Sequence, residues 1–218
     1  MSASQHPPEL AAGRLIDLPL FPLGTVLFPD GLLALKVFEA RYLDLMSACL
    51  RTGGPFGVVT LIQGDEARSG TARQPQRFEA VGCLATLQHC DSDQPGILQV
   101  QCLGGQRFEL SAPAQQPGGL WVAGAAELIA ADPAEAPSPD QVSTVAALRR
   151  AVANLSERGD EPFAQPHRYN DAGWVANRWC EILPIPLPTR HKLMALPDPQ
   201  ARLRLVDGFL RRHGIVSD

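Results

Sequence analysis

The stretch LPLFPLGTVLFPDGLLALKVFEARY, residues 18–42, alternates large apolar side chains with prolines and glycines. Short apolar runs bounded by such turn residues are typical of β-strands. We expect three strands here, at 15–21, 25–28 and 32–38. Because proline has no backbone N–H to donate, Pro19 and Pro22 predict that the first strand lies at a sheet edge or contains a bulge.

The segment that follows, residues 39–54, has the spacing of an amphipathic helix. Its apolar residues recur three and four positions apart, which places them on one helical face. These residues are Tyr42, Leu45, Met46 and Cys49. Gly53 is a suitable residue to end the helix. We therefore expect one helix inserted among the strands.

Strand patterns resume after this helix and continue to residue 130. The expected strands are 56–62, 78–90, 96–103, 106–110 and 120–130, with a polar loop at 64–76. Gly104 and Gly105 predict a hairpin turn between two of these strands. Many short strands with one inserted helix indicate an α+β fold, in which a strongly bent antiparallel β-sheet forms a partly closed barrel.

The composition changes at ADPAEAPSPD, residues 131–140, where prolines and acidic residues replace large apolar ones. Such a stretch is typical of a linker. Beyond it apolar residues recur at helical spacing, and Asp171, Thr189 and Asp198 are suited to begin helices. The sequence therefore predicts a β-rich domain at 1–131, a linker at about 131–140 and a C-terminal helical bundle at 140–218.

The chain has 218 residues and a formal net charge of -4. Proteins that bind phosphate backbones usually present a basic patch, so this charge argues against a nucleic-acid partner. No apolar run approaches the roughly 18 residues that would span a membrane, and the first residues lack the pattern of a secretory signal. We expect a cytoplasmic protein with no membrane partner.

The cysteines and histidines show no pattern of a metal site. None of the 5 cysteines forms a C-x-x-C pair, whereas a closed zinc site needs four ligands at short paired spacing. We expect reduced thiols, no metal and no cofactor.

Residues 18–42 resemble the opening of the Lon protease N-terminal domain, often called the Lon substrate-binding domain. In that family a proline-broken strand, a glycine turn and a strand ending in Phe-Pro precede a helix opened by Phe-Glu-x-Arg-Tyr. The matching motifs here are LPLFPLG, LFP and FEARY. Arg107-Phe108 and the helical segment 190–210 are similar to later parts of the family, so the resemblance covers about residues 15–210.

The resemblance implies a PUA-like fold and a non-enzymatic module that binds polypeptide or acts as an adaptor. Its implied partner is an unfolded or partly folded polypeptide, or another protein. A phosphate-binding loop needs Gly-Lys-[Ser/Thr], and neither lysine of the chain, Lys36 or Lys192, follows a glycine. Both lysines are expected on solvated surfaces, so neither forms a credible Ser-Lys dyad. We therefore expect a free-standing member of the family that lacks the ATPase and peptidase domains and is not an enzyme.

The candidate polypeptide-binding residues are the aromatic and charged residues of the opening stretch. They are Phe21, Phe28, Phe38, Glu39, Arg41 and Tyr42. Exposed apolar residues beside a proline-broken strand can accept a peptide, but the same residues can also fill a core. Glu39 and Arg41 can likewise pair with each other at a helix start. The alternative function is binding of a small ligand or nucleic acid on the PUA-like scaffold, because a fold does not determine a function.

Overall fold

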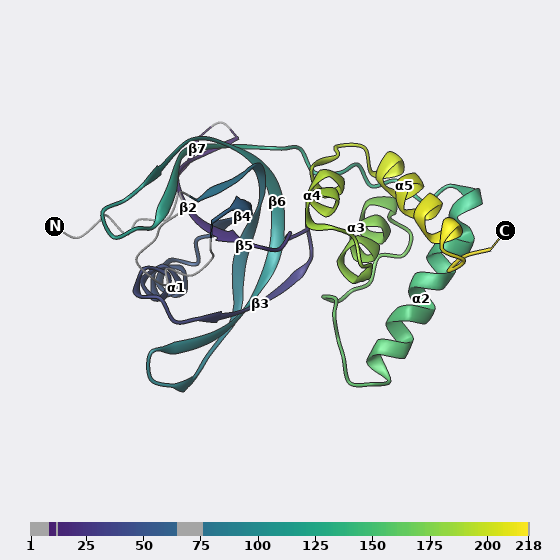
Figure 1. The fold of residues 1–218 in the computed structure, drawn as a ribbon, viewed down its shortest axis with the longest axis horizontal. Helices are drawn as coiled ribbons and strands as arrows, with labels where there is room; N and C mark the ends of the chain where they lie inside the picture. Colours follow the sequence, from purple (N-terminus) through teal and green to yellow (C-terminus); the bar gives the residue numbers. More distant parts are fainter. Residues whose placement is uncertain (1–8, 12, 65–75, 218) are drawn as a thin grey trace. The chain divides into compact units, whose positions relative to one another are not determined.

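The computed structural model describes residues 9–11, 13–64 and 76–217 and divides into two units, Met1–Ala130 and Ala131–Asp218 (Figure 1). The first unit is a bent sheet with one inserted helix, and the second consists of helices. The predicted α+β fold class is therefore confirmed. Most of the polar loop expected at 64–76 lies outside the described residues. No helix in the described part of the chain is both long enough and apolar enough to cross a membrane.

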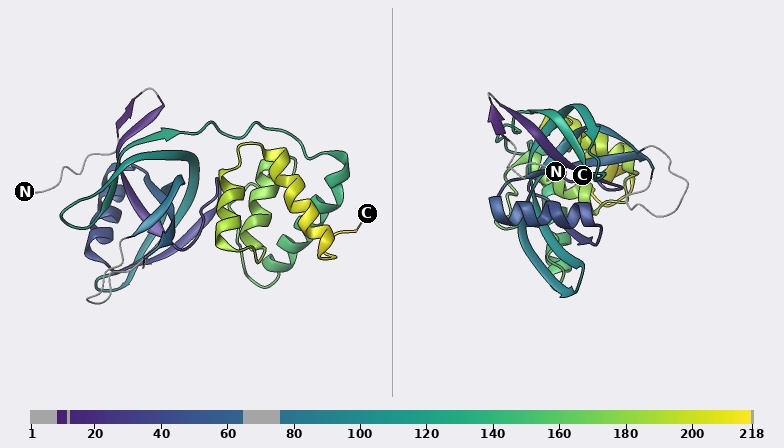
Figure 2. Two further views of the ribbon diagram at one scale, coloured as in Figure 1. Left: turned by 45° about the horizontal axis from the view of Figure 1, so that its top comes forward. Right: turned by 90° about the vertical axis from the view of Figure 1, so that its left-hand side faces the viewer.

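The sheet of the first unit curls until it closes on itself (Figure 2). Its strands are β1 Glu9–Ala11, β2 Arg14–Leu23, β3 Leu32–Val37, β4 Phe56–Gln63, β5 Arg77–Gln94, β6 Ile97–Gln115 and β7 Trp121–Leu128. They pair in the order β1-β2-β4-β5-β6-β3, while β7 pairs with both β2 and β6 and so closes a ring. All pairs are antiparallel except β2 with β4, which run parallel.

The inserted helix, α1 Ala40–Thr52, supplies one wall of the core of this unit. Its buried residues include the four of the predicted apolar face, Tyr42, Leu45, Met46 and Cys49. They pack against Phe21 of β2 and Phe56 of β4, among others. The helix ends at Gly53, as predicted. Burial of this apolar face is the main force that holds a short helix against a sheet.

The first predicted strand, β2, is not an edge strand, because it has partners on both sides. Its first part pairs with β7 as far as Leu20, and its last part pairs with β4 from Leu20 onward. Each proline lies where the strand has one of these two neighbours: Pro19 opposite Val122 and Pro22 opposite Val59. β2 as a whole is therefore not an edge strand, but each proline has a strand on one side only, so the expectation of an edge holds locally at both positions.

The strand predicted at 25–28 does not form. Residues 24–31 run as irregular chain and a turn, in which the Gly31 N–H donates to the Phe28 carbonyl at 3.0 Å. Val26, Leu27 and Phe28 are all buried, whereas strand residues would point alternately to opposite faces. Residues 25–28 therefore form a loop whose apolar side chains are buried in the first unit.

The hairpin turn predicted at Gly104-Gly105 is also wrong, because β6 runs straight through both glycines. The turn between β5 and β6 lies at Pro95-Gly96, where Gly96 has φ 77°. A Cβ on Gly104 would lie 2.1 Å from the Phe28 carbonyl oxygen. Gly104 therefore serves the close approach of another segment and not a turn.

The second unit contains a 3-10 turn and four helices. They are η1 Pro139–Gln141, α2 Val142–Ser156, α3 Ala172–Ile182, α4 Leu187–Ala195 and α5 Pro199–Arg212. The predicted caps at Asp171 and Asp198 are confirmed, since their carboxylates accept from the backbone N–H of Trp174 and Ala201, both at 3.0 Å. The prediction that Thr189 begins a helix is wrong: α4 already starts at Leu187. Pro188 lies in its first turn, where the N–H that proline lacks would have no partner within the helix.

The predicted linker contacts the helices of the second unit through Asp132 and Glu135. The guanidinium of Arg202, on α5, is buried and lies 2.7 Å from a carboxylate oxygen of Asp132. The same guanidinium donates to Asn177 Oδ1 and to the Leu193 and Leu196 carbonyls. The carbonyl of Glu135 accepts from the backbone N–H of Ala172 at 2.8 Å. The first residues of the stretch 131–140 are thus ordered by charge and backbone contacts.

Candidate functional site

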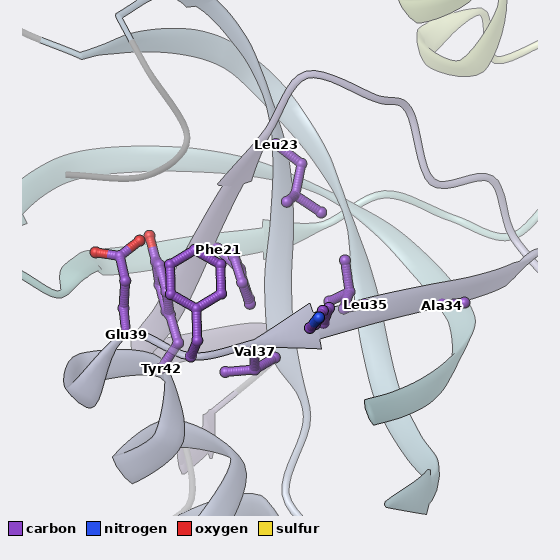
Figure 3. Close-up of a pocket in the computed structure, with 9 residues that line it drawn as sticks. Phe21, Leu23, Ala34, Leu35, Val37, Glu39 and Tyr42 are labelled. Atoms are coloured by element: carbon purple, nitrogen blue, oxygen red, sulfur yellow. The ribbon is translucent and has the colours of Figure 1, made fainter. Parts of the chain in front are cut away.

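A pocket of about 170 Å³ opens where β2, β3 and the start of α1 meet (Figure 3). Its lining combines apolar side chains with Tyr42 and the charged residues Lys36 and Glu39, and polar and apolar atoms contribute about equally to its surface. The lining residues are Phe21 and Leu23 of β2, Ala34, Leu35, Lys36 and Val37 of β3, Phe38, Glu39, and Tyr42 of α1. The pocket is smaller than the roughly 300–1,000 Å³ of typical small-ligand sites, and its size suits a side chain better than a cofactor.

The change from strand to helix produces one wall of the pocket. Strand β3 ends at Val37, which is buried, and α1 begins at Ala40 with Glu39 as its N-cap residue. Phe38 lies between β3 and α1 and belongs to neither element, and 56% of its surface is exposed. A large aromatic side chain so exposed beside a pocket is a natural contact for another molecule.

The floor of the pocket is an aromatic pair. The rings of Phe21 and Tyr42 lie parallel, with centroids 3.8 Å apart and an angle of 9° between their planes. The guanidinium carbon of Arg41 lies 4.4 Å from the centroid of the Tyr42 ring. Since Phe21 covers one face of that ring, the guanidinium occupies the other. Tyr42 is therefore fixed between an aromatic ring and a cation.

Arg41 is held in turn by two polar partners. Its Nη2 lies 3.0 Å from a carboxylate oxygen of Glu39, and its Nη1 donates to the Gly119 carbonyl at 2.9 Å. The Arg41 side chain is buried and that of Glu39 is largely so. The pair ties the start of α1 to the loop before β7, which keeps the pocket floor in place.

The structure brings together most of the residues predicted from the opening stretch. Phe21, Phe38, Glu39 and Tyr42 line the pocket, and Arg41 lies directly behind Tyr42. Phe28 does not line the pocket: it is fully buried, and its backbone carbonyl lies against Gly104 of β6.

Sequence reasoning missed the contribution of β3. Ala34, Leu35, Lys36 and Val37 all line the pocket, yet they read as an ordinary strand. Their position beside β2 depends on the pairing of β3 with β6, a partner more than 60 residues later in the chain. No local signal in the sequence carries that information.

The pocket offers no obvious nucleophile or metal ligand set. The described residues contain no group of three or more His, Cys, Asp or Glu side chains that could hold a metal ion. Burial raises the pKa of the Cys49 thiol to about 11 and that of Cys102 to about 12. Thiols with such values are poor nucleophiles at neutral pH.

Comparisons with known proteins agree with this arrangement. Residues 17–212 match the family model described as the ATP-dependent protease La (LON) substrate-binding domain. A Lon N-terminal domain protein from Xanthomonas campestris is 28% identical, with a TM-score of 0.70, over 88% of this chain and 97% of that one. The N-terminal domain of the Mycobacterium avium complex Lon protease has a similar fold, with a TM-score of 0.58 and 17% identity, over 90% of this chain and 99% of that one. A search of curated proteins gave no match.

Proposed function

We propose that this chain, which belongs to the ATP-dependent protease La (LON) substrate-binding domain family, recognises unfolded or partly folded polypeptide at the pocket between β2, β3 and α1. In this role it is a binding or adaptor module, and any hydrolysis is carried out by another domain or protein. The residues that make the contact are Phe21, Phe38, Glu39 and Tyr42, with Arg41 holding Tyr42 in position.

One observation carries the proposal: the exposed ring of Phe38 lies beside a small pocket that contains the stacked apolar rings of Phe21 and Tyr42. Unfolded polypeptides differ from folded ones in presenting apolar side chains to solvent. A small pocket of this kind next to an exposed ring can bury one such side chain without demanding a particular sequence. Because little area is buried and the peptide loses conformational freedom, we expect dissociation constants of roughly micromolar or weaker.

The charges of the site favour a polypeptide over the alternative ligands. The pocket lining contains a single lysine, Lys36, and a single carboxylate, Glu39. A site for a phosphate backbone needs several cations, and a drug-sized ligand needs a larger cavity. Arg41, the nearest further cation, is engaged by Glu39 and by the Gly119 carbonyl.

Binding of a permanently unfolded protein tests the proposal. The probe is reduced, carboxymethylated α-lactalbumin carrying fluorescein, titrated with the full chain and followed by fluorescence anisotropy. We expect Phe38→Ser to weaken binding by about fivefold or more, because it removes an apolar side chain worth roughly 1–2 kcal/mol of contact. Urea unfolding of the variant should match that of the unsubstituted protein, because exposed side chains add little to stability.

Leu50→Ser is the matched control, since Leu50 lies on α1 of the same unit with 59% of its surface exposed and does not line the pocket. This variant should bind the probe as the unsubstituted protein does. Equal weakening by both substitutions would point to nonspecific apolar adhesion. Unchanged binding by Phe38→Ser would exclude this pocket as the site.

A further inference from the structure

We propose that the bound polypeptide adds a β-strand to the free edge of β3, with one of its side chains seated in the pocket. This inference rests on the proposed function and specifies how the substrate is held: by its backbone, in extended form. It makes the peptide N–H and C=O groups, which every sequence has, the main contact.

The free edge of β3 follows from its hydrogen bonds. Among the described strands β3 pairs with β6 alone, in an unbroken register from Leu32 opposite Leu103 to Val37 opposite Leu98. The Gly104 N–H donates to the Gly31 carbonyl at 2.8 Å. Backbone groups of an antiparallel strand point alternately to its two sides. The groups of Leu33, Leu35 and Val37 therefore face β6.

The remaining residues of β3 face the other way. The N–H and C=O groups of Leu32, Ala34 and Lys36 point away from β6, and no described backbone hydrogen bond engages them. Donors and acceptors at this spacing are the pattern that another strand satisfies. These groups are suited to bind the backbone of an extended polypeptide.

The pocket lies along this edge and not on a face of the sheet. It is lined by four consecutive residues of β3, from Ala34 to Val37. Consecutive strand residues point to opposite faces, so one pocket can contact all four only beside the strand. Figure 3 shows Phe21 and Leu23 of β2 across the pocket from Leu35 and Val37.

The sheet path leaves a gap at this place. Beyond Leu20, β2 pairs with β4 and no longer with β7, so its final residues have a single strand neighbour among the described strands. The path β2-β4-β5-β6-β3 begins at this part of β2 and ends at β3. An added strand would run along β3 at this gap, so that one of its side chains enters the pocket between the two ends of that path.

The side chains of β3 suit a foreign strand better than a second copy of the chain. Lys36 is exposed at the edge, and a charged residue at an edge opposes pairing between two identical strands. Leu33 and Leu35 pack toward the core, so a residue of the added strand beside them would extend that apolar surface into the pocket. We therefore assign the edge to a segment of substrate with alternating apolar residues.

Backbone methylation of a peptide tests the inference without altering the protein. The probe is a fluorescein-labelled decapeptide in which phenylalanine and serine alternate, made unmodified, N-methylated at every Phe, or N-methylated at every Ser. In an extended strand the N–H groups of the phenylalanines point to one edge and those of the serines to the other. Each methylated peptide therefore lacks the donors of one edge. We expect one set to weaken binding by roughly tenfold or more and the other by less than about twofold, because only one edge pairs with β3.

Ala34→Pro provides the complementary test, since it removes an N–H of the free edge and none of the bonds to β6. It should weaken binding of the unmodified peptide by about fivefold or more, and it should have less effect on the peptide whose methyl groups already block pairing with β3. The methylated peptides decide the question if Ala34→Pro does not fold.

The outcomes separate this inference from the function it rests on. Equal binding by both methylated peptides, or no binding of the unmodified decapeptide, overturns strand addition. If Phe38→Ser still weakens binding of unfolded α-lactalbumin in that case, the pocket remains the site and only the backbone pairing is wrong. If Phe38→Ser has no effect, the proposed function itself fails.

Discussion

The Phe21 and Tyr42 rings stack at 3.8 Å and join a strand to a helix that follows it by almost twenty residues. Phe21 and Tyr42 belong to the hydrophobic core of the first unit, and both residues also line the pocket. On the proposed function, stability and binding are therefore linked at this pair, while Phe38 lies outside it. We therefore expect substitutions of Phe21 and Phe38, which line the same pocket, to change the free energy of unfolding by different amounts.

Phe21→Ala should lower the free energy of unfolding by about 3–5 kcal/mol, because it leaves a cavity beneath Tyr42 and removes the stacked contact. Phe38→Ala should change it by less than about 0.5 kcal/mol, since Phe38 is largely exposed. Urea titrations followed by circular dichroism measure both. Equal losses for the two variants would show that Phe38 is packed in solution.

Two adjacent glycines of β6 should respond oppositely to the same substitution. A Cβ on Gly104 would meet the Phe28 carbonyl oxygen at 2.1 Å, whereas the nearest neighbour of a Cβ on Gly105 is 3.5 Å away. We expect Gly104→Ala to destabilise by roughly 1–3 kcal/mol or more through forced backbone movement. Gly105→Ala should be neutral or slightly stabilising. Thermal unfolding of the pair gives the comparison, and similar melting temperatures would contradict it.

Two arginines of α5 that each pair with an aspartate should contribute very differently. Arg202 is buried and lies 2.7 Å from the largely buried Asp132, whereas Arg204 and Asp198 are exposed and 3.8 Å apart. Arg202→Met should cost about 3–5 kcal/mol, because it leaves the largely buried Asp132 carboxylate without its cation. Arg204→Met should cost less than about 0.5 kcal/mol. Denaturant unfolding distinguishes them, and a small effect of Arg202→Met would contradict the buried pair.

We propose that the helical unit folds independently, and that it needs the start of the predicted linker to do so. A fragment of residues 131–218 keeps Asp132, whereas a fragment of residues 140–218, the bounds expected from the sequence, loses it. The longer fragment should show a cooperative thermal transition and the shorter one a transition at lower temperature, because Arg202 then has no carboxylate partner. Identical transitions would place the boundary at 140.

Stability should fall in the alkaline range through the buried thiols. Burial holds the pKa of Cys102 at about 12, while a thiol of the unfolded chain titrates near about 8.5. Above that pH the unfolded state binds fewer protons than the native state, so the free energy of unfolding decreases as pH rises toward 12. Below that pH the thiol has no effect on the slope. Urea midpoints between pH 8 and 10.5 should fall less steeply for Cys102→Ala than for the unsubstituted protein.

Features with a local cause were predictable from the sequence. The apolar face of α1, its end at Gly53 and the caps at Asp171 and Asp198 depend on residues within a few positions of one another. The α+β class follows from the same kind of signal. The stretch 18–42 also indicated where the pocket would form, because the strand-to-helix junction lies within it.

Features that depend on distant partners were not predictable. Phe28 and Phe38 are ten positions apart with similar apolar neighbours, yet one is fully buried and the other 56% exposed. The difference arises because the loop carrying Phe28 packs on Gly104 of β6. The roles of Pro19 and Pro22 likewise required knowledge of which strand lies on each side of β2.

The pairing of β2 with β7 bears on how the chain is made. Arg14 pairs with Glu127, so a strand near the start of the chain waits for its partner until more than a hundred further residues have left the ribosome. During that interval β2 has β1 beside its first residues, but Leu18, Pro19 and Leu20 lack the antiparallel neighbour that β7 provides. Closing so long a loop is slow, and exposed strands of this kind are prone to aggregate during synthesis. On the function proposed above, a module that recognises unfolded chains is thus, for part of its own synthesis, a candidate client of the cell's chaperones.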